Sequence, residues 1–361
     1  MLVLHVGPHK TATTWLQSNF HRNARALEKA GWLYPMTGER VRIAHHDLSD
    51  NAKDILDPQS RKVALLTRVA ERARAGNLNV LLSSEGFRHW TPSQIKALQK
   101  IFAPHEIRIV YCLRDPVSLL YSFWAQGVKT GSSASLPEFY ARQKSQGKKS
   151  RVFNPLREIG RFTRAARGNL TVLLYDEIRK SGRDIFDVFA QDILGVSGLD
   201  KEPARGKNEQ QPIEMTEFMR LVLKRIGTWK AKGQVNIGRV FQHMLTDARR
   251  MEIIATVGAC RPKADRLLVV ERDQRFLDRL EQKLLRQYRD AMIPAPGEKL
   301  FLTGPAALTY LDEAALLENA GVKGELSRIS RRFRPGGLYM WVANWSRFWL
   351  VQWRRLTNRF R

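Results

Sequence analysis

The N-terminal half of the chain alternates between short apolar runs and longer segments with helical periodicity. Short aliphatic or β-branched runs predict buried strands, and apolar positions that recur with the helical period predict helices. The predicted strands cover residues 2–6, 79–83, 107–113 and 169–175. The predicted helices cover residues 13–30, 59–75, 91–102, 116–127 and 155–167. Strands that alternate with helices predict an α/β fold with a parallel sheet covered on both faces.

The pattern beyond residue 183 is mainly helical. The predicted helices of this half cover residues 183–194, 212–227, 238–256 and 273–291. Residues 129–151 contain Gly, Ser and several basic residues with few apolar ones, and this composition predicts a mobile loop. The predicted organisation is an α/β core, a helical extension that completes the same domain, and a basic tail, over residues 1–200, 201–325 and 326–361.

The predicted tail has an unusual composition. From Leu326 to Arg361 it contains nine arginines and no acidic residue. Four tryptophans recur every fourth residue, so on a helix they form one apolar stripe, opposite arginines: Trp341, Trp345, Trp349 and Trp353. A helix of this kind, within residues 336–361, suits the surface of an anionic membrane. The alternative is a helix that packs on the body of the protein or on a second subunit.

Composition narrows the class of protein. The 361 residues include 61 Lys and Arg against 35 Asp and Glu, a formal net charge of +26 that attracts polyanions. The two cysteines, Cys112 and Cys260, exclude a disulfide framework and indicate a reducing compartment. The chain shows neither a signal peptide before the first strand nor an apolar run long enough to span a membrane. We therefore expect a cytoplasmic protein.

Residues 7–15 read Gly-Pro-His-Lys-Thr-Ala-Thr-Thr-Trp, between the first predicted strand and the first predicted helix. Such a turn directs free N–H groups and the positive end of the helix dipole at one point, where phosphate binds. Four side chains here suit an anion: Lys10, Thr11, Thr13 and Thr14. A Walker A loop has Lys immediately before its final Ser or Thr, whereas Thr13 occupies that place. This difference argues against an ATPase or kinase.

A second candidate motif follows the strand predicted at 107–113. Arg114 stands at the end of this strand, and Ser122 lies eight residues further on, inside the next predicted helix. A guanidinium meets phosphate oxygens in pairs, and a hydroxyl adds a further donor. Ser118 lies one helical turn before Ser122 and could substitute for it.

The two motifs resemble those of sulfotransferases that use 3′-phosphoadenosine 5′-phosphosulfate (PAPS), in particular carbohydrate sulfotransferases of the bacterial type. The loop of that family has the usual form Pro-Lys-Ser-Gly-Thr-Thr-Trp. Residues that match it directly are Lys10, Thr13, Thr14 and Trp15. Thr11 replaces the usual Ser and Ala12 the usual Gly, and Ala is strained there if the position requires positive φ. The resemblance covers roughly residues 1–195.

The resemblance implies a P-loop-type fold and a role for each matched residue. The loop would hold the 5′-phosphosulfate, and Arg114 with Ser122 the 3′-phosphate. Trp15 and Tyr175 would contact the adenine. Lys10 would stabilise the leaving phosphate during in-line transfer to a hydroxyl or amine, so that no metal is required. The basic segment 129–151 and the net charge favour a carbohydrate or glycolipid as acceptor, including one that is already anionic. The sequence leaves a homo-oligomer open.

The general base is open among three residues. The family often has His or Glu at the end of the second strand, and Glu85 follows the strand at 79–83. His45 and His46 are the alternatives, on a loop after the first helix. Two other classes of function remain. One is a nucleotide or metabolite kinase with a variant P-loop, which would require Mg²⁺. The other is a nucleic-acid-binding protein, which only the net charge favours, since no recognisable nucleic-acid-binding motif is present.

Overall fold

The computed structural model describes residues 1–8, 10–36, 43–202, 211–226, 245–271 and 274–332. They fall into two compact units that are interleaved along the chain. The first contains the described residues of 1–119, 147–209 and 272–304, and the second those of 120–146, 210–271 and 305–361. The predicted tail helix lies outside the described residues. In the part of the chain that is described, no helix is both long enough and apolar enough to cross a membrane.

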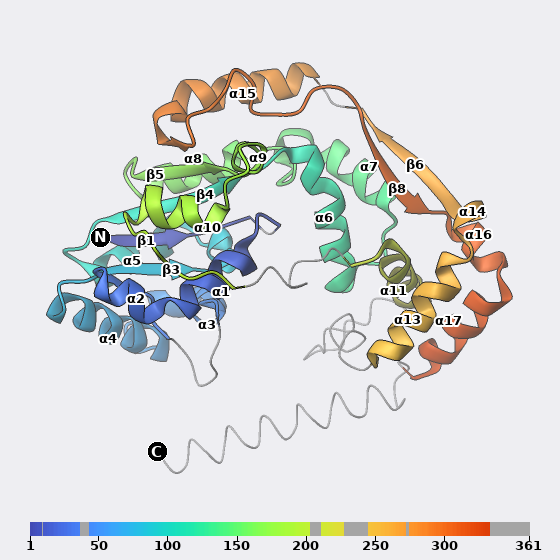
Figure 1. Ribbon diagram of the computed structural model, residues 1–361, viewed down its shortest axis with the longest axis horizontal. Helices are drawn as coiled ribbons and strands as arrows, with labels where there is room; N and C mark the ends of the chain where they lie inside the picture. Colours follow the sequence, from blue (N-terminus) through green and yellow to red (C-terminus); the bar gives the residue numbers. More distant parts are fainter. Residues whose placement is uncertain (9, 37–42, 203–210, 227–244, 272–273, 333–361) are drawn as a thin grey trace, which may run out of the picture. The chain divides into compact units, whose positions relative to one another are not determined.

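A six-stranded parallel sheet forms the centre of the first unit (Figure 1). Its strand order is β2-β3-β1-β4-β5-β7, and every pair of neighbours is parallel. The strands are β1 (Leu2–His5), β2 (Trp32–Leu33), β3 (Asn79–Ser83), β4 (Ile107–Leu113), β5 (Leu170–Leu174) and β7 (Met292–Ile293). The predicted α/β class with a parallel sheet is confirmed. Strands β2 and β7 were not predicted, because two residues give no periodic signal.

Alternate residues of the strands build two separate apolar cores, one on each face of the sheet. Leu2 and Leu4 of β1 face one core, whereas Val3 faces the other. The first core is covered by α4 (Arg61–Ala75), α5 (Pro92–Phe102), α8 (Leu156–Ala165) and α15 (Gln274–Tyr288). The second core is covered by α1 (Thr13–Arg22), α2 (Ala24–Lys29), α10 (Ile185–Val188) and the π-helix η4 (Phe189–Ile193). Burial on both faces explains why the strands are apolar throughout.

The predicted helix 13–30 is interrupted at Asn23, between α1 and α2. The Asn23 side-chain amide donates to the backbone oxygens of Asn19 and Asp200, at 2.8 and 2.7 Å. Its side-chain oxygen accepts from the Asp200 amide at 3.0 Å. The interruption is therefore held by a contact between residues 177 positions apart, which helical periodicity does not register.

The prediction of a mobile loop at 129–151 is wrong. Residues Leu136–Gln146 form helix α7, and Gly147–Lys149 form the 3₁₀ helix η3. Ser135 and Glu138 exchange hydrogen bonds as a capping box: the Glu138 amide donates to the Ser135 hydroxyl, and Glu138 accepts from the Ser135 amide. Buried Leu136 and Phe139 then anchor the helix. The spacing of Ser135 and Glu138 is a capping signal that is visible in the sequence. The loop was predicted from the Gly, Ser and basic residues of the segment alone.

The second unit is mainly helical around a small antiparallel sheet. Its elements include the later part of α6 (Pro116–Lys129), α7, α11 (Ile213–Ile226), α13 (Asp247–Gly258), α14 (Arg261–Ala264), β6 (Asp265–Val270), β8 (Ala306–Leu311), α16 (Glu313–Glu318) and α17 (Ala320–Arg332). Strands β6 and β8 were not predicted. Glu217 and Arg220, both fully buried on α11, form an ion pair at 2.5 Å, and Arg220 also reaches Glu313.

A buried ion pair joins the sheet's carboxyl edge to α8. Arg88, on the 3₁₀ helix η2 (Glu85–His89) that follows β3, donates to both carboxylate oxygens of Glu158 at 2.8 and 2.9 Å. The two side chains are 4% and 5% exposed. The Tyr111 hydroxyl also donates to Glu158, at 3.2 Å. Because both ions are desolvated, removing one leaves an uncompensated charge in the core.

We predict that Glu158→Ala lowers the free energy of unfolding by about 3–5 kcal/mol, because Arg88 is then buried without its carboxylate. The double variant Arg88→Met, Glu158→Met should recover most of this loss, since it buries no charge. Urea denaturation of the three proteins measures both effects. A loss below about 1 kcal/mol in the single variant would show that water reaches the guanidinium.

Candidate functional site

The loop between β1 and α1 has an unusual backbone. Lys10 and Ala12 have positive φ, 71° and 56°, and Thr11 between them lies outside the left-handed region. Alternation of this kind turns successive N–H groups toward one side and forms an anion-binding concavity. Ala12 is also the N-cap of α1, whose free amides point the same way. The loop therefore has the backbone geometry to hold an oxyanion.

Two of the three threonine hydroxyls are engaged within the protein. Thr11, fully buried, donates to the Pro8 carbonyl at 2.9 Å and closes the loop. Thr13, 3% exposed, donates to the Glu85 carboxylate. Thr14 is exposed at the start of α1. The predicted set of hydroxyls thus divides into two that shape the loop and one that is open to a ligand.

Gly7 allows Glu85 to approach the loop. Its φ is +59°, and a Cβ placed there would lie 3.2 Å from Glu85 Cγ and 3.3 Å from Thr13 Cγ2. Both the backbone conformation and the close approach require glycine. The glycine two residues after β1 is therefore required by the packing of the Glu85 carboxylate beneath the loop.

The Lys10 side chain is partly buried at the loop. Burial lowers the pKa of its ammonium group, and the charge of Glu85 opposes that shift. Within the described residues, no carboxylate forms an ion pair with the Lys10 ammonium. A partly buried cation without an ion-pair partner among the described residues is suited to a negatively charged ligand.

Two of the three candidate bases lie together. Glu85 begins η2 directly after β3, and His46 begins the short helix α3 (His46–Ser49). The His46 Nε2 and Glu85 Oε2 atoms are 3.9 Å apart, and His46 Nδ1 hydrogen-bonds to the Ser84 hydroxyl at 2.9 Å. The histidine side chain is 44% exposed, whereas the glutamate is 7% exposed. The His46 imidazole is therefore accessible to solvent, and the carboxylate next to it, Glu85, is shielded.

His45, by contrast, is built into the body of the first unit. Its Nδ1 accepts a hydrogen bond from the Ser83 amide at 2.9 Å, so Nε2 carries the proton that is donated to the Pro35 carbonyl at 2.8 Å. The side chain is buried, and burial lowers its pKa. With both ring nitrogens held by backbone groups, His45 serves as a structural link rather than as an accessible base.

Arg114 links the second motif to the loop. Its Nη1 donates to the Lys10 carbonyl at 2.8 Å, and its guanidinium carbon lies 5.1 Å from the centre of the Tyr175 ring. The Nε atom is 3.8 Å from Asp176 Oδ1 and has no hydrogen-bond partner among the described residues. The structure therefore brings together Lys10, Arg114 and Tyr175, which come from three different strand ends.

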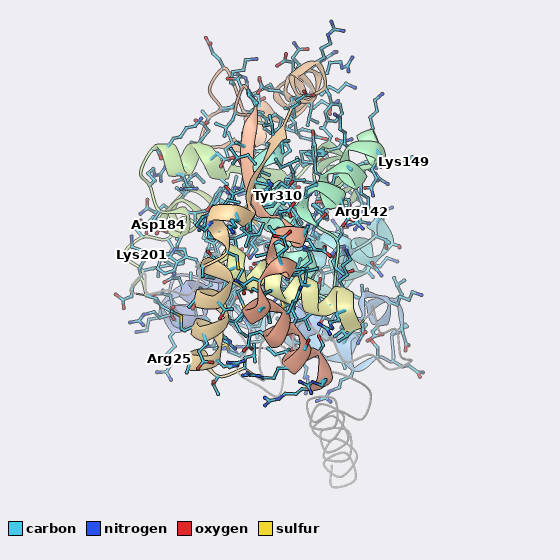
Figure 2. The ribbon with its side chains drawn as sticks, turned by 90° about the vertical axis from the view of Figure 1, so that its right-hand side faces the viewer. Arg25, Arg142, Lys149, Asp184, Lys201 and Tyr310 are labelled. Carbon is cyan, nitrogen blue, oxygen red and sulfur yellow. The ribbon has the colours of Figure 1, made fainter. Side chains whose placement is uncertain are left out.

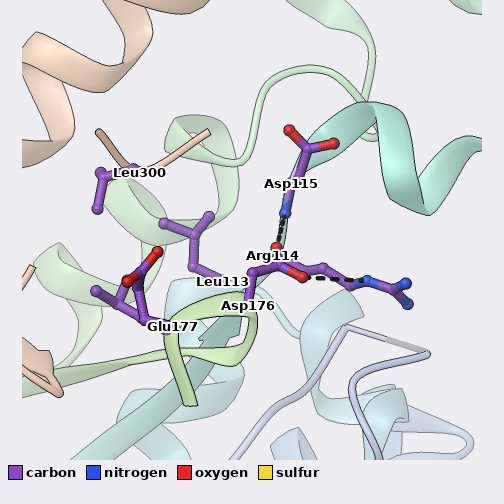
Figure 3. A pocket seen from close by; sticks show the side chains of 7 residues that line it. Leu113, Arg114, Asp115, Asp176, Glu177 and Leu300 are labelled. Carbon is purple, nitrogen blue, oxygen red and sulfur yellow. Dashed lines mark hydrogen bonds and ion pairs between the residues drawn. The ribbon is translucent and has the colours of Figure 1, made fainter. Parts of the chain in front are cut away.

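A small pocket adjoins Arg114 at the ends of β4 and β5 (Figure 3). Its lining residues are Leu113, Arg114, Asp115, Leu174, Asp176, Glu177 and Leu300. The Asp115 amide donates to Asp176 Oδ2 at 2.7 Å, and burial raises the pKa of the Asp176 carboxyl. This contact ties α9 (Tyr175–Lys180) to the start of α6 and so fixes the tyrosine beside Arg114.

The two predicted serines differ in their surroundings. Ser118 donates both its amide and its hydroxyl to Asp115 Oδ1, at 2.7 and 2.9 Å, and so helps to cap α6. Ser122 lies one turn further along this helix, within the second unit, with a partly exposed side chain. The Ser118 hydroxyl is therefore already committed to Asp115.

Trp15 is half-buried near the start of α1. Its indole N–H donates to Asp184 Oδ1 at 3.1 Å, and Asp184 also caps α10. The ring packs at the margin of the second apolar core. The position is compatible both with core packing and with one exposed ring face for a base.

Sequence reasoning missed a polar layer beneath the loop. Gln17 Nε2 donates to Glu85 Oε2 at 3.2 Å, one turn after Thr13 on the same face of α1. Buried His5 hydrogen-bonds to the Ser83 hydroxyl at 2.8 Å and contacts Cys112 Sγ at 3.7 Å. The four-residue spacing from Thr13 was a usable signal for Gln17. No pattern along the chain signals the contacts of His5, which depend on strand register.

Comparison of the chain with protein-family models, with curated proteins and with solved structures found no match. Across the described ranges, no group of three or more His, Cys, Asp or Glu side chains is placed to hold a metal ion. The features that bear on function are therefore those of the first unit, where Lys10, Arg114 and Tyr175 come together.

We predict that Ala12→Gly leaves the protein at least as stable as wild type, to within about 0.5 kcal/mol. Relief of the left-handed alanine, about 1 kcal/mol, offsets the entropy that glycine gains in the unfolded chain. Ala26→Gly, at an exposed position inside α2, is the control and should cost about 1 kcal/mol. Equal losses in urea denaturation would contradict the observed conformation of residue 12.

A second prediction concerns acid stability. Burial lowers the pKa of His5 from 6.5 to about 4, so the folded protein keeps this imidazole neutral. The unfolded chain takes up the proton first as pH falls from 6.5 to 4, so folding loses about 3 kcal/mol across that window. Between pH 6.5 and pH 4, the free energy of unfolding of His5→Gln should therefore fall by about 3 kcal/mol less than that of wild type. Parallel pH profiles for the two proteins would contradict the prediction.

Proposed function

We propose that the chain is a PAPS-dependent sulfotransferase with a P-loop-type donor site, acting on a hydroxyl or amine of a carbohydrate or glycolipid. The observation that carries the proposal is the grouping of Lys10, Arg114 and Tyr175. An anion-binding loop, a guanidinium and an aromatic ring match the 5′-phosphosulfate, 3′-phosphate and adenine of one ligand. The Arg114 Nη1 bond to the Lys10 carbonyl holds the two anion-binding parts at a set distance.

The loop and Lys10 would stabilise the leaving group. The acceptor oxygen attacks the sulfur in line as the bond from sulfur to the 5′-phosphate oxygen breaks. Negative charge then grows on that phosphate oxygen. Backbone N–H groups of residues 10–14 and the Lys10 ammonium would offset it, and fixed donors of this kind need little reorganisation. The products are the sulfated acceptor and 3′-phosphoadenosine 5′-phosphate.

His46 would take the proton from the acceptor, with Glu85 as its partner. The imidazole is accessible, and a nearby carboxylate stabilises the imidazolium that forms. Glu85 itself accepts from Thr13 and Gln17, so it also keeps the loop in place. Of the three candidate bases, the Glu85–His46 pair is therefore the one that we propose, and His45 has a structural role.

The proposed location of the protein is the cytoplasm. The two cysteines favour a cytoplasmic protein, and both are reduced and buried in the described chain. Residues 336–361, which lie outside the described residues, would be the segment that binds the inner face of the membrane.

The donor assignment is tested by calorimetry with 3′-phosphoadenosine 5′-phosphate and with ADP, which lacks the 3′-phosphate. Wild type should prefer the former. Arg114→Ala should reduce that preference about 10- to 100-fold, the range expected for charge-assisted hydrogen bonds to one phosphate. The ratio of the two affinities is the readout, because the variant also loses its bond to the Lys10 carbonyl.

Arg108→Ala is the matched control. Arg108 lies on the same strand, and its Nε donates to the Asn169 side chain at 3.3 Å. This variant should keep the wild-type ratio. Equal affinity of wild type for the two nucleotides would refute the donor assignment and return attention to a kinase.

A further inference from the structure

Three arginines and a histidine lie around the C-terminal end of η2. We define the η2 cluster as Arg88, His89, Arg151 and Arg161, with Glu158 as its one carboxylate. All five residues belong to the first unit. Three guanidiniums therefore share a single acid.

The charge of Glu158 is already committed. Arg88 donates to both of its oxygens, and the Tyr111 hydroxyl donates to one of them. Arg161 reaches no carboxylate: its Nη2 donates to the Arg88 carbonyl, and its guanidinium lies 5.0 Å from the centre of the Phe162 ring. Its Nε is buried and has no hydrogen-bond partner in the described chain. Arg161 thus retains unused hydrogen-bonding capacity.

Arg151 adds an exposed cation. Its Nη1 hydrogen-bonds to His89 Nδ1 at 3.2 Å. Burial lowers the pKa of Arg161, and the positive charges of Arg151 and Arg88 lower it further, against the opposing effect of Glu158. Like charges are therefore held together where an anion would relieve their repulsion.

The position of the cluster relates it to the proposed reaction. Glu85 begins η2 on the side of α1, and Arg88 reaches α8 on the opposite face of the sheet. A 3₁₀ helix rises about 2 Å per residue, so Glu85 and His89 lie roughly 8 Å apart along its axis. One short helix thus carries a proposed proton-accepting partner at one end and the cations at the other.

We propose that the η2 cluster binds a sulfate, phosphate or carboxylate group of the acceptor, which makes the acceptor an anionic glycan. The inference rests on the proposed function, since it places this group at one end of η2 and the reacting oxygen at the other. Exposed Lys148 and Lys149, the latter labelled in Figure 2, precede Arg151 by three and two residues and add two further positive charges to this part of the chain. An extended anionic chain fits such a surface better than a single small ion does.

The test compares two variants with the same loss of charge. Arg151→Gln removes the exposed cation of the cluster, and Arg25→Gln removes an exposed cation from α2, which covers the other face of the sheet. The probe is a sulfated dextran oligosaccharide in about 0.15 M salt. The neutral oligosaccharide of equal length is the blank. Arg151→Gln should bind the sulfated probe about tenfold more weakly than wild type, and Arg25→Gln within about twofold.

Three outcomes decide the matter. Equal losses in the two variants would overturn the proposal, because they would reflect net charge alone. Competition by inorganic sulfate at the same total sulfate concentration would also overturn it, since the cluster would then be a site for a free ion. Failure of wild type to bind 3′-phosphoadenosine 5′-phosphate would remove the donor assignment, whereas the oligosaccharide measurement contains no donor and judges the anion site by itself.

Discussion

The arrangement of the site depends on one buried carboxylate. Glu85 accepts hydrogen bonds from Thr13 and Gln17 of α1 and so ties the end of β3 to the loop that follows β1. Gly7 is required for its approach, and the pKa of Lys10 reflects its charge. Glu85 therefore connects the β1–α1 loop, the first turns of α1 and the end of β3, and His46 lies 3.9 Å from the same carboxylate.

Much of the parallel sheet could be predicted because buried strands are apolar throughout. Strands β3 and β4 have the predicted bounds, and β1 and β5 differ only at their ends. Other features depend on contacts between distant residues. The break at Asn23 is held by Asp200, and the two-residue strands β2 and β7 exist only through their pairing. Helix α7 differs, because its Ser135–Glu138 capping box is visible in the sequence, whereas the predicted loop rested on composition alone.

The candidate site could be anticipated in outline for a topological reason. Parallel strands bring their carboxyl ends to one edge, so Lys10, Arg114 and Tyr175 were expected to converge. The choice between His45 and His46 could not be made, since it depends on the Pro35 carbonyl and the Ser83 amide. The η2 cluster could not be predicted from the sequence either, because it forms only when α8 brings Glu158 and Arg161 to Arg88.

The central claim is that the β1–α1 loop and Arg114 hold the two ends of one nucleotide. A crystal structure with 3′-phosphoadenosine 5′-phosphate tests it most directly. The account predicts the 5′-phosphate on the backbone amides of residues 10–14 and the 3′-phosphate on the guanidinium of Arg114, with the adenine near Tyr175. A nucleotide bound elsewhere, or one whose 3′-phosphate points into solvent away from Arg114, would contradict it.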